Sequence, residues 1–156
     1  MTTCRPAGGL AHRLNPARTN TPTVPDDSAA WKPYIYKGLP VLLDRRPPQI
    51  APYQLRLDWQ MWFAAMSSSD EYLWTYNLVW KLLHNDPRAV GLFATNPFPE
   101  KPPRYIRAVL YRYTFAKPGN PQRLWWNRER VALWLPVLSA NDPRLVEFLK
   151  SKEWIH

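Results

Sequence analysis

The chain has 156 residues, of which 46% are apolar, so its length and composition suit one folded domain with a substantial core. Eighteen prolines against five glycines exclude a glycine-rich low-complexity chain and a long coiled coil. The only cysteine, Cys4, excludes an internal disulfide framework and a zinc site built from cysteines of one copy of the chain.

The formal net charge of +9 is concentrated in one segment. Residues 101–130 carry eight lysines and arginines against one glutamate, whereas residues 51–100 carry three basic residues against five acidic ones. A local basic surface suits nucleic acid, anionic lipid headgroups or an acidic protein, and the charge alone leaves all three open. No apolar stretch approaches the ~20 residues that a membrane-spanning helix needs.

Residues 1–30 hold few large aliphatic side chains, so we expect a disordered leader there and a folded domain over residues 31–156. The leader lacks the apolar region of a secretory signal. The aromatic, proline-broken sequence that follows predicts two short strands, at residues 34–36 and 41–43, and then a polyproline-like connector.

Two tryptophan-rich helices are predicted next. In the first, Asp58 is placed to cap the helix start. Four apolar residues after it recur at helical spacing and are expected to face the core: Trp59, Trp62, Phe63 and Met66. Residues 71–84, entered through a Ser68–Glu71 capping box, are apolar around most of the helix and predict the buried centre of the domain.

Asp-Pro pairs at 86–87 and 142–143 predict a short third helix and a terminal helix. Between them, residues 105–115 alternate as a strand, and residues 131–138 supply a return strand. We therefore expect an α+β fold, in which a small, mostly antiparallel β-sheet packs against the buried tryptophan-rich helix and short flanking helices.

Five uncommon strings occur in one order along this chain. They are Arg56-Leu57-Asp58-Trp59-Gln60-Met61-Trp62-Phe63-Ala64-Ala65, Asn96-Pro97-Phe98-Pro99, Pro102-Pro103-Arg104-Tyr105-Ile106-Arg107-Ala108, Tyr111-Arg112-Tyr113 and Trp125-Trp126-Asn127-Arg128-Glu129. Through them the chain resembles the lipase maturation factor family over roughly residues 31–152. The resemblance implies the family's C-terminal soluble domain, which follows a multi-pass membrane portion and in animals faces the lumen of the endoplasmic reticulum; a bacterial member would lie at the cell membrane.

The resemblance also implies a non-enzymatic, chaperone-like factor that assists the folding, assembly and secretion of lipases by binding them. We expect the partner contacts in the proline-rich loop 96–103 and the basic aromatic segment after it. The expected contact residues are Asn96, Pro97, Phe98, Pro99, Pro102, Pro103, Arg104, Arg107, Trp125, Trp126 and Arg128. Phe98, between two prolines, suits an exposed contact, although a loop phenylalanine folded back as a plug is equally common.

The motif around the first helix is expected to be structural, with tryptophans that fill the core rather than form a recognition surface. Its residues are Arg56, Asp58, Trp59, Gln60, Trp62 and Phe63.

Groups for catalysis are sparse. His84 ends a predicted helix, where it most simply contacts free carbonyls, and no histidine or carboxylate group has the spacing of metal ligands. We therefore expect no enzymatic activity, no cofactor and no metal. The alternative is a basic aromatic module that binds nucleic acid or a membrane surface; nucleic acid is disfavoured because no RNP, KH or zinc-knuckle signature is present.

Overall fold

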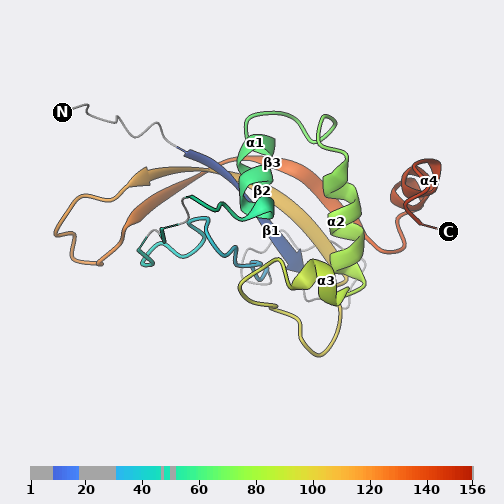
Figure 1. Cartoon of the computed structure of the whole chain (residues 1–156), viewed down its shortest axis with the longest axis horizontal. Helices are drawn as coiled ribbons and strands as arrows, with labels where there is room; N and C mark the ends of the chain where they lie inside the picture. The colour runs from blue at the N-terminus through green and yellow to red at the C-terminus, as the bar shows by residue number, and fades with distance from the viewer. Residues whose placement is uncertain (1–8, 18–30, 47, 50–51, 156) are drawn as a thin grey trace.

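The computed structural model describes residues 31–46, 48–49 and 52–155, together with the backbone of residues 9–17. Helices and strands follow one another along these residues in the order shown in Figure 1. They are β1 (Gly9–Ala17), α1 (Arg56–Ala64), α2 (Trp74–Leu83), α3 (Pro87–Val90), β2 (Tyr105–Phe115), β3 (Trp126–Ser139) and α4 (Pro143–Ser151). The α+β prediction is confirmed.

The three strands form one antiparallel sheet with β2 in the middle. On one side β1 pairs with β2 from Gly9 opposite Tyr113 to Ala17 opposite Tyr105. On the other side β3 forms a hairpin with β2, and register shifts near Ile106 and Leu110 interrupt the ladder. The predicted strands at 105–115 and 131–138 are confirmed, and β3 begins earlier than expected.

Strand β1 departs from the sequence prediction. The leader expected over residues 1–30 is not disordered at residues 9–17, because their backbone is hydrogen-bonded to β2. An edge strand obtains its pairing from main-chain groups, so it needs no strong apolar pattern that sequence analysis could detect. The rest of the expected leader lies outside the described residues.

The strands predicted at 34–36 and 41–43 are also wrong, since both stretches are irregular, apart from the bridge that Ile35 makes with Thr95. Two of their aromatic side chains are buried in the hydrophobic core instead. Tyr34 and Tyr36 are fully buried, and their ring centroids lie 5.0 and 5.1 Å from that of Phe93. Burial raises the pKa of both phenols above the ordinary value.

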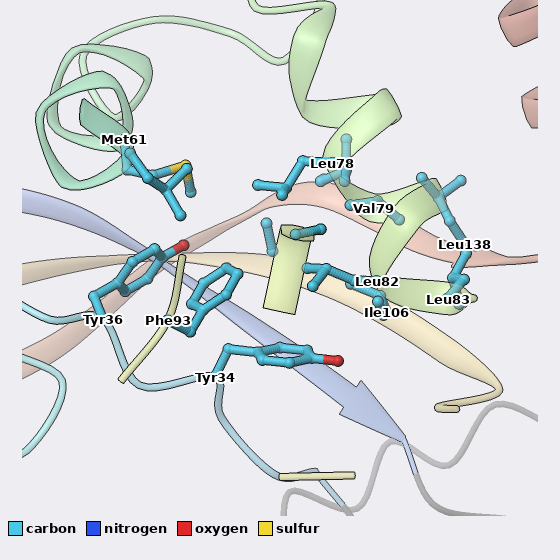
Figure 2. Packing of buried hydrophobic residues seen from close by; sticks show 14 of the residues in the cluster. Tyr34, Tyr36, Met61, Leu78, Val79, Leu82, Leu83, Phe93, Ile106 and Leu138 are labelled. Carbon is cyan, nitrogen blue, oxygen red and sulfur yellow. The ribbon is translucent and has the colours of Figure 1, made fainter. Parts of the chain in front are cut away.

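Helix α2 lies over the sheet and contributes Leu78, Val79, Leu82 and Leu83 to the hydrophobic core (Figure 2). Its buried residues are Thr75, Leu78, Val79, Leu82 and Leu83. The four aliphatic residues among them pack in one cluster with Ile106 of β2 and Leu138 of β3. The prediction of a central helix at 71–84 is thus confirmed for its aliphatic side chains, while its tryptophans, Trp74 and Trp80, are only partly buried.

Two of the four helix starts predicted from capping residues are confirmed. Asp86 accepts hydrogen bonds from the backbone N–H groups of Ala89 and Arg88, which lower its pKa. Asp142 caps α4 by accepting from the backbone N–H of Arg144. The Ser68–Glu71 capping box is wrong, because Glu71 accepts from Ser67 and α2 begins at Trp74 without a side-chain cap. The α1 cap is wrong as well, since α1 begins at Arg56, before Asp58.

Asp58 has a different structural role. Its side chain is buried, and Oδ1 accepts hydrogen bonds from the backbone N–H groups of Gly38, at 2.7 Å, and Leu39, at 3.0 Å. The carboxylate therefore ties α1 to the irregular segment that carries Tyr34 and Tyr36. Within the described residues, no helix is long and apolar enough to cross a membrane.

Candidate partner-binding surfaces

The side chain of Phe98 is buried, so the structure favours a plug over an exposed contact. Two asparagines hold the backbone around it. Asn96 Oδ1 accepts from the N–H of Phe98 at 2.9 Å, and Asn85 Nδ2 donates to the carbonyl of Phe98 at 3.1 Å. Asn96 Nδ2 also donates to Asn85 Oδ1 at 3.0 Å. The Asn-Pro-Phe-Pro string thus fixes a loop conformation.

Only part of the predicted contact set near this loop is accessible. Pro103 and Arg107 are buried, and the Arg107 guanidinium lies 4.0 Å from the ring centroid of Trp31. Pro97 and Asn96 are half-buried. The residues left exposed at this end are Pro99, Pro102 and Arg104.

The other predicted contact residues lie on the β2–β3 hairpin. Trp125 is 44% exposed. Trp126 is half-buried and stacks on Phe115, with ring centroids 4.7 Å apart. The Arg128 guanidinium lies 4.7 Å from the centroid of Tyr111 and donates to the carbonyl of Val41 at 3.4 Å.

The predicted set does not form one surface. Arg104 precedes the first residue of β2, whereas Trp126 pairs with the last, Phe115. A strand advances ~3.4 Å per residue, so the two ends of β2 lie roughly 34 Å apart. Figure 1 shows the hairpin extending to one side, away from α3 and the loop after it. Two separate surfaces therefore take the place of the expected one.

The end of the hairpin is a fixed structure. The Asn120 side chain accepts from the N–H of Leu124 and donates to the carbonyls of Leu124 and Lys117, all within 2.9 Å. Gly119 has φ +76°, a conformation that favours glycine. The backbone N–H groups of Trp125 and Trp126 donate to the carbonyl of Leu43 at 2.8 and 3.2 Å, which anchors the hairpin on the body of the domain.

We call this end the hairpin tip surface, made of Phe115, Lys117, Arg123, Trp125 and Trp126. A cavity of about 630 Å³ lies among the residues that line the loop from Phe115 to Trp125. Phe115 is 53% exposed, and Lys117 and Arg123 are exposed as well. The predicted contact set does not include these three residues. Phe115 joins the surface because the strand register places it opposite Trp126.

The tryptophans of α1 do not fill the core, so that prediction is wrong. Trp59 is 44% and Trp62 40% exposed, and each ring contacts the other and the half-buried Phe63 at centroid distances of 4.9–5.5 Å. The helix has a second apolar face, and Leu57 and Met61 on that face are the buried ones. Arg56 is exposed and Gln60 half-buried.

In the described part of the chain, no group of three or more histidine, cysteine, aspartate or glutamate side chains could hold a metal ion. His84 Nδ1 lies 2.8 Å from the carbonyl oxygen of Trp80, at the end of α2. The stacking of Arg107 on Trp31 and of Arg128 on Tyr111 leaves fewer open ring faces for nucleic-acid bases.

The chain is similar in sequence to a family of known proteins. The family model of the lipase maturation factor C-terminal domain matches residues 20–136. Lipase maturation factor 1 of Mus musculus is 41% identical over 140 residues, which are 87% of this chain and 24% of that protein. Lipase maturation factor 1 of Bos taurus is 42% identical over 130 residues, 81% of this chain and 23% of the relative.

Lipase maturation factor 2 of Mus musculus is 39% identical over 128 residues, which are 80% of this chain and 18% of that protein. The chain therefore spans a quarter or less of the length of these relatives. No solved structure matches the chain. The resemblance expected from the five strings is confirmed, and the family match begins at residue 20, inside the segment expected to be a leader.

Proposed function

The chain belongs to the lipase maturation factor family, and we propose from this membership that it takes part in the maturation of secreted lipases. It acts without catalysis, as a chaperone-like module that binds an incompletely folded lipase. The setting we propose is the lumenal side of the endoplasmic reticulum membrane, or the cell membrane in a bacterium.

The observation that carries client binding is the hairpin tip surface. It combines exposed aromatic rings with the cations of Lys117 and Arg123, and aromatic and arginine side chains supply most of the energy of protein interfaces. Because Asn120 already fixes the loop, little conformational entropy is lost when a partner binds. Apolar segments that a folding lipase has not yet buried suit such a surface.

The experiment uses cells that lack a maturation factor. These cells express either the isolated chain or a chimera in which this chain replaces the matching region of mouse lipase maturation factor 1. Secreted lipase activity is then measured. We expect the Phe115→Ser, Trp125→Ser double variant of the chimera to secrete several-fold less active lipase than the unmodified chimera, because it removes two exposed anchors.

Pro99→Ala with Arg104→Ala is the matched control, since both residues are exposed at the opposite end of β2. Substitutions of Phe98 or Arg107 are unsuitable, because these side chains are buried and their loss would disturb the fold. Normal secretion from the hairpin variant would remove the hairpin tip surface from the proposal. Secretion by the chimera but not by the isolated chain would show that the remainder of the relative is required.

A further inference from the structure

The outer face of α1 carries an apolar surface that the proposed function does not use. We call it the α1 aromatic face, made of Leu55, Trp59, Trp62, Phe63 and Met66. Leu55 is 40% and Met66 56% exposed, in addition to the two tryptophans. The helix is thus covered by the domain on its Leu57–Met61 side and open to solvent on the other.

A shallow groove runs into this face. It has a volume of about 300 Å³ and is lined by Leu39, Gln54, Leu55, Asp58, Trp59 and Trp62. Asp58 Oδ1 accepts from two backbone N–H groups and Oδ2 is buried, so the groove offers mainly hydrocarbon and indole surface. A hydrocarbon chain suits such a lining better than a polar ligand does.

Along the helix segment that carries this face, the exposed charge has one sign, and the nearest exposed carboxylates in sequence are Asp44, Asp70 and Glu71. Between Pro52 and Met66 the only lysine, arginine, aspartate or glutamate residues are Arg56 and Asp58, and Asp58 is buried. Arg56 is exposed and lies three residues before Trp59, on the same side of the helix. Tyr53, which is 89% exposed, stands just before the helix. No exposed carboxylate therefore lies in this stretch to repel an anionic surface.

We propose that the α1 aromatic face docks on the surface of a bilayer that contains anionic phospholipid. Tryptophan and tyrosine prefer the boundary between headgroups and hydrocarbon, where the ring is apolar and the N–H or O–H stays hydrated. Arg56 pairs with a headgroup phosphate, and the groove takes the end of an acyl chain. The formal charge of +9 attracts the whole chain to such a membrane.

This proposal does not depend on the lipase role, because it uses a different surface from the hairpin tip. A protein partner is the competing occupant of the face. We favour lipid because the groove lining is almost entirely apolar and the exposed rim adds one cation, whereas protein interfaces usually contribute many directed hydrogen bonds.

The test is flotation of the purified full chain with vesicles of phosphatidylcholine alone or with ~30% phosphatidylglycerol, an anionic fraction chosen to give a strong surface potential. We expect the unmodified chain to float with the anionic vesicles. The Trp59→Ser, Trp62→Ser double variant should bind about tenfold or more weakly, because two interfacial rings are lost. Arg56→Gln should bind about fivefold more weakly, the value expected for one cation near the surface.

Trp125→Ser is the matched control, since this tryptophan is as exposed as Trp59 but lies on the hairpin. It should float like the unmodified chain. Urea denaturation of each variant verifies that the domain is folded. Equal flotation of the double variant and the unmodified chain would overturn the proposal, and so would absence of flotation by the unmodified chain. Self-association without flotation, abolished by Trp59→Ser with Trp62→Ser, would assign the face to a protein contact and also overturn it.

Discussion

Helices α1 and α2 are similar in length, and each contains two tryptophans. The apolar stripes of both helices suggest that these tryptophans are buried, and in the structure they are not fully buried in either helix. In α2 the aliphatic residues Leu78, Val79 and Leu82 are buried, and Trp74 and Trp80 lie at the margin of the core. In α1 the buried residues are again the non-aromatic ones, and Trp59 and Trp62 are outside. In both helices the aliphatic side chains form the face that packs on the core. The larger tryptophan rings lie at the margin of that face or on the outside.

The strongest test of this comparison is Leu82→Ala. The side chain is fully buried between α2 and the sheet, so its loss removes apolar contacts and leaves a cavity. We expect the free energy of unfolding to fall by about 3–4 kcal/mol. Urea denaturation measures the change. A loss below about 1 kcal/mol would mean that the aliphatic side of α2 is not the centre of the core.

The buried tyrosines sharpen the comparison, because they are the aromatic side chains that do enter the core. In the folded chain the pKa of Tyr34 and of Tyr36 is raised above the model-peptide value of 10.0, chiefly by burial. Their contribution to stability is therefore complete below pH 10 and is lost as the pH rises towards the folded pKa. Each tyrosine costs about 1.4 kcal/mol per pH unit above 10, so we expect the two to cost roughly 3 kcal/mol at pH 11.

Urea midpoints at pH 9 and pH 11 measure this loss, and Tyr36→Phe should reduce it by about half. At pH 7 the same variant should be as stable as the unmodified chain, because the buried hydroxyl of Tyr36 has no hydrogen-bond partner among the described residues. If the Tyr36→Phe variant lost as much stability between pH 9 and pH 11 as the unmodified chain, the Tyr36 hydroxyl would be exposed to water rather than buried.

Asp58→Ala tests how α1 is held. It removes the carboxylate that accepts from Gly38 and Leu39, and hydrogen bonds to a buried charged group contribute about 1.5–3 kcal/mol. We expect a loss of roughly 2–3 kcal/mol in the free energy of unfolding. Asp58→Asn, which keeps one acceptor oxygen in place, should lose clearly less. Equal losses in the two variants would show that the charge, and not the acceptor geometry, matters.

The smallest effects belong to the tryptophans themselves. Trp80 is half-buried and its ring centroid lies 4.3 Å from that of His84, so we expect Trp80→Ala to lose about 1–2 kcal/mol, less than the 3–5 kcal/mol of a fully buried ring. Trp59→Ala, at an exposed position, should lose under about 1 kcal/mol. Thermal unfolding of the two variants side by side measures both. A larger loss for Trp59→Ala would reverse the comparison of the two helices.

The sequence predicts the parts of this fold that local signals determine. The Asp-Pro pairs start α3 and α4, and the alternation over residues 105–115 coincides with β2. The orientation of α1 could not be predicted, because both of its faces are apolar and only contacts with distant segments decide which one is buried. The same is true of Phe98, whose loop is held by a hydrogen bond from Asn85, a residue between α2 and α3, to the Phe98 carbonyl.

The candidate surfaces were predicted less well than the fold. The sequence places Arg104 and Trp125 in one basic aromatic segment, and the length of β2 separates them. Phe115 belongs to the hairpin tip because β3 returns with Trp126 opposite it. A contact surface brings together residues from distant parts of the chain. Residue type and position in the sequence therefore identify candidate side chains, but they do not show which of these side chains share one surface.

The pairing of β1 with β2 also bears on the order in which the domain assembles during synthesis. Gly9 meets Tyr113, so β1 leaves the ribosome roughly a hundred residues before its partner, an interval of about 5–20 s at ordinary elongation rates. The β2–β3 hairpin, by contrast, closes through residues 116–125 and forms from neighbouring parts of the chain. When β2 emerges, β1 is already present to pair with one of its two edges, so only the edge that β3 will cover is open while β3 is synthesised.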